Sequence, residues 1–60
     1  MPAGCGPGVV MKAWKWIIKM PGGALMRTGF FHAMSMHAQV EANNAGGVLV
    51  GIDMSTLTVF

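Results

Sequence analysis

The chain has 60 residues, of which 53% are hydrophobic and only 10% are charged; its mean hydropathy is +0.55 and its formal net charge is +2. Soluble domains carry about 25% charged residues, and disordered segments combine low hydrophobicity with high net charge. This composition argues against a solvated tail and predicts one small unit, residues 1–60, that lies against a membrane, inside a larger assembly or in an aggregate.

The N-terminal part of the chain divides into a lead-in and a predicted helix. Residues 1–8 hold three glycines and two prolines, which predict an irregular lead-in. Residues 9–20 predict a helix, because lysines and apolar side chains fall on opposite sides when the segment is wound at about 100° per residue. Pro21 ends this helix, and Gly22 and Gly23 add a flexible corner.

The predicted first helix is cationic and carries both tryptophans of the chain. Tryptophan and lysine both favour the level of the lipid headgroups. Every basic residue precedes Glu41, the first acidic residue, and this asymmetry favours an anionic surface as partner, either lipid headgroups or nucleic acid. The candidate membrane-interface residues are Lys12, Trp14, Lys15, Trp16, Lys19 and Arg27.

Residues 24–42 predict a second helix, because good helix formers occupy many of their positions. Apolar side chains lie most of the way round it, which is typical of a helix enclosed by protein or lipid. Asn43, Asn44, Gly46 and Gly47 predict its stop. The longest run without charge, residues 28–40, is shorter than the about 20 residues that a spanning helix needs. A conventional spanning anchor is therefore disfavoured, whereas a short or tilted span stays open.

The tail, residues 48–60, is rich in β-branched residues and is predicted to be extended. It could form a short hairpin or add an edge strand to a partner. The predicted fold class is therefore mostly α: two short helices joined by a Pro-Gly-Gly corner, followed by an extended or β-like C-terminal tail.

Two histidines and two methionines within six residues form the densest group of potential metal ligands. Imidazole and thioether donors suit Cu(I), but no single helical face gathers all four side chains. The favoured interpretation is that the methionines, among seven in the chain, act as pliable packing. No cofactor is therefore expected, with copper or a pigment ligated by histidine as weaker alternatives. The candidate metal ligands are His32, Met34, Met36 and His37.

Catalytic and nucleic-acid functions find little support in the sequence. Ser35 lies near two histidines but lacks a Gly-x-Ser-x-Gly elbow, and the glycines form no phosphate-binding loop. Four basic residues make too small a footprint for nucleic acid. We therefore expect neither an enzyme, nor a small-molecule substrate, nor a nucleic-acid partner.

The function expected from the sequence is that of a small, non-catalytic, membrane-associated polypeptide. It would serve as an accessory or structural subunit of a larger membrane complex, with membrane lipid and that complex as its partners. The first alternative is a cationic amphipathic, membrane-active peptide of antimicrobial or toxin-like type. The second is a His/Met copper-binding peptide.

Overall fold

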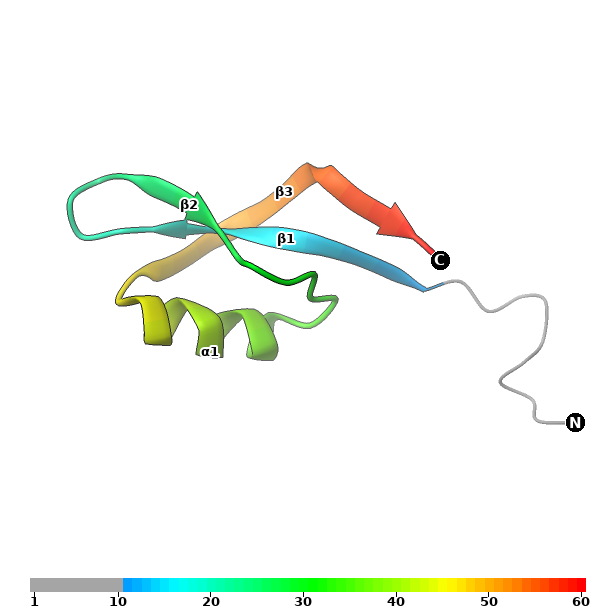
Figure 1. Ribbon diagram of the computed structural model, residues 1–60, viewed down its shortest axis with the longest axis horizontal. Helices are drawn as coiled ribbons and strands as arrows, with labels where there is room; N and C mark the ends of the chain where they lie inside the picture. Colours follow the sequence, from blue (N-terminus) through cyan, green and yellow to red (C-terminus); the bar gives the residue numbers. More distant parts are fainter. Residues whose placement is uncertain (1–10) are drawn as a thin grey trace, which may run out of the picture.

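The computed structural model describes residues 11–60, which form a three-stranded antiparallel sheet and one helix (Figure 1). The lead-in predicted at residues 1–8 lies outside the described residues. Strand β1 lies between the other two strands, in the order β2-β1-β3. Helix α1 lies along one face of the sheet, and no described helix lies on the other, which we call the open face. The elements are β1 (Lys12–Lys19), β2 (Leu25–Arg27), α1 (Ser35–Ala45) and β3 (Val48–Val59).

The prediction of a mostly α fold is wrong, since 46% of the described residues are strand and 22% are helix. The predicted helix at residues 9–20 is replaced by strand β1 at Lys12–Lys19. Trp14, Trp16 and Ile18 recur at every second position, which places them on one face of a strand. Aromatic and β-branched residues favour this conformation, and β1 gains a hydrogen-bonded neighbour on each side. An isolated helix of this length has no such support.

The second predicted helix, residues 24–42, is also wrong as a single element. Its first residues form β2 and a loop, and α1 begins only at Ser35. Thr28 explains the late start, because this buried residue binds β1 through both its backbone and its side chain. Its N–H donates to the Trp16 carbonyl at 2.9 Å, and its Oγ1 accepts the Trp16 N–H at 3.1 Å. These bonds hold the segment beside the sheet.

The predicted helix stop agrees with the structure at Gly46 and Gly47, whereas Asn43 and Asn44 lie within α1. Gly46 follows the last helical residue with a φ of 81°, a left-handed conformation that glycine adopts without strain. Its N–H donates to the carbonyl of Asn43 at 3.1 Å. The C-terminal tail, expected to be extended, forms β3.

Strand β3 bends near its middle, where residues 54–57 interrupt its ladder with β1. Side chains fix this bend. The hydroxyl of Thr56 donates to the Asp53 carbonyl at 2.7 Å and accepts the N–H of Lys15 at 2.8 Å. A second register shift leaves Val50 without a partner on β1. These hydrogen bonds stabilise the bend of β3.

The core between α1 and the sheet is small. Ile18 is 1% exposed, and Ala38 and Ala42 are the only other buried hydrophobic residues of the described chain. The two alanines are four residues apart on α1 and so share one helical face. Their small side chains let the helix approach the sheet closely. One isoleucine therefore supplies most of the buried apolar volume.

Gly47 is predicted to be intolerant of a side chain, because it lies where α1 returns to the sheet. A Cβ placed there would lie 2.9 Å from the Lys19 carbonyl oxygen and would overlap the side chain of Ile18. We expect Gly47→Ala to lower the free energy of unfolding by about 1 to 3 kcal/mol, measured by urea denaturation followed by circular dichroism. Gly51→Ala is the matched control, since no atom lies within 4 Å of its added Cβ. Equal losses in the two variants would contradict this prediction.

Candidate functional site

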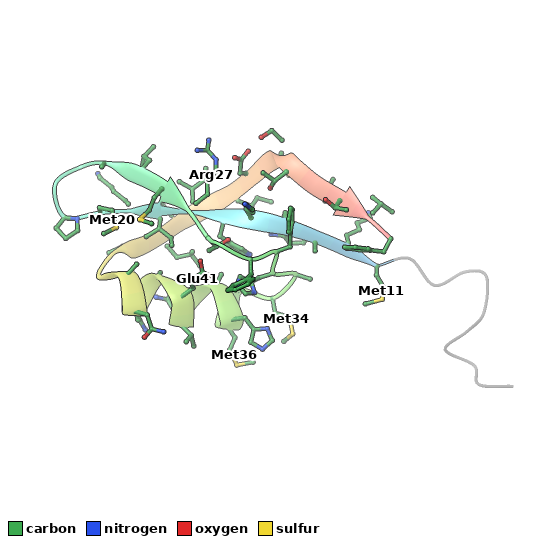
Figure 2. All side chains as sticks on the ribbon, in the orientation of Figure 1. Met11, Met20, Arg27, Met34, Met36 and Glu41 are labelled. Carbon is green, nitrogen blue, oxygen red and sulfur yellow. The ribbon has the colours of Figure 1, made fainter. Side chains whose placement is uncertain are left out.

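The open face is defined by the register of the three strands. Residues that pair across strands share a face, so Arg27 lies beside Ile17, and Asp53 lies beside Lys15. Lys19 belongs to the same face by the period of two. Figure 2 shows the side chain of Arg27 on the side of the sheet opposite α1. The open face therefore carries Lys15, Ile17, Lys19, Leu25, Arg27, Val48 and Asp53.

Asp53 is almost fully buried and is engaged within the chain. It forms an ion pair with the guanidinium of Arg27, and its Oδ1 accepts hydrogen bonds from Ser55 Oγ at 2.6 Å and Ser55 N–H at 3.1 Å. The hydrogen bonds from Ser55 and then Arg27 lower the pKa of Asp53 from 3.8 to about 2. Asp53 is therefore ionised at neutral pH, with its charge offset by Arg27.

The lowered pKa of Asp53 predicts a loss of stability in acid. Its pKa is 3.8 unperturbed and about 2 in the folded chain, so the folded state favours the carboxylate. The resulting stabilisation is complete above the unfolded pKa and is lost as the pH falls through the folded one. We expect the urea midpoint to fall between pH 3.8 and about 2, measured by circular dichroism.

Asp53→Asn separates this effect from the titration of Glu41. The variant is expected to be less stable than the parent chain at pH 7, and the difference should vanish below the folded pKa. A constant difference across the acid range would contradict the assignment to Asp53.

Glu41 is also engaged within the chain, between α1 and the sheet (Figure 2). Its carboxylate accepts the N–H of Gly29, and its Oε1 lies 2.9 Å from Nε2 of His32, in hydrogen-bond contact. Burial raises the pKa of Glu41, but the hydrogen bonds from His32 and Gly29 outweigh this effect and hold the pKa below its usual value. Both carboxylate side chains of the protein are thus used internally.

The lysines are not neutralised in this way. Within residues 11–60 Arg27 is the only lysine or arginine that pairs with a carboxylate. Nζ of Lys15 lies 5.5 Å from the centre of the Phe31 ring, and Lys12 and Lys19 are exposed. The described surface therefore carries uncompensated positive charge on β1.

The structure separates the six predicted membrane-interface residues into two groups. Lys15, Lys19 and Arg27 meet on the open face. Lys12, Trp14 and Trp16 follow the opposite alternation and lie on the face that α1 covers. The two tryptophans are half-buried with ring centres 6.4 Å apart, and the Trp16 indole N–H donates to the His32 carbonyl at 2.9 Å. Their role is therefore in packing.

The helical interpretation of the sequence missed the apolar members of the open face, which are Leu25, Ile17 and Val48. Leu25 and Val48 flank Lys19 on its two neighbouring strands. The alternation of β1 is the signal that could have revealed the face, because it puts the lysines at positions 15 and 19 on the same side as Ile17. No local sequence pattern shows which residues of β2 and β3 pair with β1.

The predicted metal ligands lie in the loop before α1 and in its first turn. The rings of His32 and His37 are 6.1 Å apart, while Met34 and Met36 are exposed and point away from the sheet (Figure 2). Nε2 of His32 already contacts Glu41, so a metal at this nitrogen would displace that contact. In the described part of the chain no three His, Cys, Asp or Glu side chains group closely enough to hold a metal ion. The copper site stays a prediction.

Comparison with known proteins identifies no relative of the chain: no family model, no curated protein and no solved structure matches it. None of the helices in residues 11–60 has the length and hydropathy needed to cross a bilayer. The charge and exposure of the open face are therefore the features that bear on function.

Proposed function

We propose that this chain is a small, non-catalytic accessory polypeptide of a larger membrane complex, and that its open face contacts anionic lipid headgroups. The observation that carries the proposal is the uncompensated charge of Lys15 and Lys19 beside exposed apolar side chains. Both carboxylates are held in internal contacts, so the face presents cations to its surroundings. Such a face attracts anionic lipid by about 1 kcal/mol for each lysine near the surface.

The apolar part of the open face supports contact with the boundary between headgroups and acyl chains. Leu25 is 61% exposed and Val48 is 63% exposed, and they flank Lys19 on its two sides. Apolar side chains enter this boundary while the ammonium groups of lysines stay among the headgroups. The face therefore combines the two attractions that interfacial binding needs.

Exposed hydrophobic residues elsewhere support the role of a subunit. Fourteen large hydrophobic side chains are exposed in the described chain, against three hydrophobic residues that are buried. Phe30 on the loop and Val40 on α1 are exposed outside the three strands. Exposed apolar surface of this extent is typical of proteins that are covered by a partner.

Fractionation of the source cells tests this proposal. The full chain, carrying an affinity tag, is expected in the membrane fraction and, after extraction in mild detergent, in a complex of fixed stoichiometry by native mass spectrometry. Recovery as a free chain in the aqueous fraction would contradict the proposal. Release of dye from anionic vesicles by the purified chain would instead support a membrane-permeabilising peptide.

A further inference from the structure

Strand β3 is an edge strand with an unpaired outer side. It pairs with β1 only, and none of residues 11–60 pairs with its other side. It has 12 residues, whereas β2, the strand at the opposite edge, has three. The outer side therefore offers a row of backbone N–H and C=O groups to another strand.

Two of the usual protections of an edge strand, charge and proline, are missing from β3, although the bend and the register shift at Val50 interrupt its regularity. Natural edges carry lysine, proline or unpaired charge that prevents another strand from adding. β3 contains no lysine, arginine or proline, and its single charge, Asp53, is held by Arg27 and Ser55. The part before the bend, residues 48–53, begins with the apolar sequence VLVGI. This half of the strand is open to addition.

A hollow of about 460 Å³ adjoins the same half of β3. Val48 and Val50 form one of its sides, although Val50 has no partner on β1 and is 54% exposed. The described chain therefore leaves both valines of this half uncovered. The residues that line it are Lys19, Met20, Pro21, Gly46, Val48 and Val50.

We propose that β3 pairs antiparallel with β3 of a second copy of this chain. Antiparallel pairing of a strand with its own copy satisfies a two-fold axis, so one surface supplies both sides of the contact. The charge pattern permits it, because Asp53 is neutralised and no other charge on β3 would face its like. The product is a six-stranded sheet with the short β2 at each end, which closes the assembly as a dimer.

The dimer has a consequence for the open face. A two-fold axis that relates antiparallel neighbouring strands runs perpendicular to their sheet, so both open faces lie on the same side. Lys15 and Lys19 of the two copies then form one continuous cationic surface. The dimer itself does not depend on the membrane proposal, because it is measured without lipid.

Sedimentation velocity of the full chain without lipid tests this inference. The parent chain is expected at twice the 6.3 kDa protomer mass. Val50→Lys is expected to be a monomer, because a lysine on an edge strand opposes the addition of another strand. Val40→Lys on α1 is the matched control, with 56% exposure against 54% for Val50, and is expected to stay dimeric. Circular dichroism checks that both variants fold.

Amide hydrogen exchange of the parent chain supplies a readout that does not depend on any variant. Amides of β3 are expected to become better protected as protein concentration rises, while those of β2 do not. A parent chain that is monomeric at all concentrations would overturn the inference. So would a Val50→Lys variant that remains dimeric, protection of β3 that is independent of concentration, or assembly that grows beyond the dimer.

Discussion

Ile18→Ala is expected to remove a large share of the stability of the protein. Ile18 is the only large hydrophobic side chain that is fully buried in the described chain, and it packs where α1 meets the sheet. Truncating a buried isoleucine to alanine lowers the free energy of unfolding by about 2 to 5 kcal/mol. A chain of this size has about 3 to 9 kcal/mol in total, at about 0.05 to 0.15 kcal/mol per residue. The loss therefore removes a large share of the stability.

Urea denaturation followed by circular dichroism measures this effect at one fixed protein concentration, since self-association changes the midpoint. Ile17→Ala is the matched control. Ile17 is the neighbouring isoleucine on β1, but it lies half-buried on the open face. Ile17→Ala is expected to lower the free energy of unfolding clearly less than Ile18→Ala. If the two variants lose equal stability, α1 does not pack on the face that carries Ile18.

Lys15→Gln combined with Lys19→Gln is expected to weaken binding to anionic vesicles by about 30-fold. Each lysine near an anionic surface contributes about 1 kcal/mol, so the pair contributes about 2 kcal/mol. The measurement is co-sedimentation of the full chain with vesicles of phosphatidylglycerol at low salt. Replacing the same two residues with arginine keeps the charge and should preserve the binding.

Lys12→Gln tests whether binding to anionic vesicles depends on the open face or on the net charge of the chain. Lys12 follows the opposite alternation of β1 and lies on the other face of the strand, so its removal is expected to change the binding by less than about twofold, well under the about 1 kcal/mol of a lysine near the lipid surface. Equal effects of the three lysines would show that overall charge, and no particular face, governs the association.

The sequence around β1 contains two periodicities, and this explains the wrong fold prediction. Lys12, Lys15 and Lys19 are three and four residues apart, which fits a helix, whereas Trp14 and Ile18 belong to an alternation that fits a strand. Local pattern alone does not choose between them. The choice depends on β3, whose Val48 and Val59 pair with the two ends of β1 from the far end of the chain.

The candidate site was predictable only in part. Its cations follow from composition, because few basic residues occur and they all precede Glu41. The ion pair that offsets the charge of Asp53 does not follow from composition. Arg27 and Asp53 are 26 residues apart and meet only through the sheet register. The expected extended tail and the Gly46 stop carried local signals, and both agree with the structure.

Binding of the open face to an anionic membrane surface is tested by comparing two vesicle compositions. The full chain is titrated with vesicles of phosphatidylglycerol and, separately, of phosphatidylcholine at the same low salt concentration. We predict binding to the anionic vesicles at least about tenfold tighter, weakening as salt screens the lysines. Equal partitioning into both vesicles, or binding that salt does not weaken, would contradict the claim.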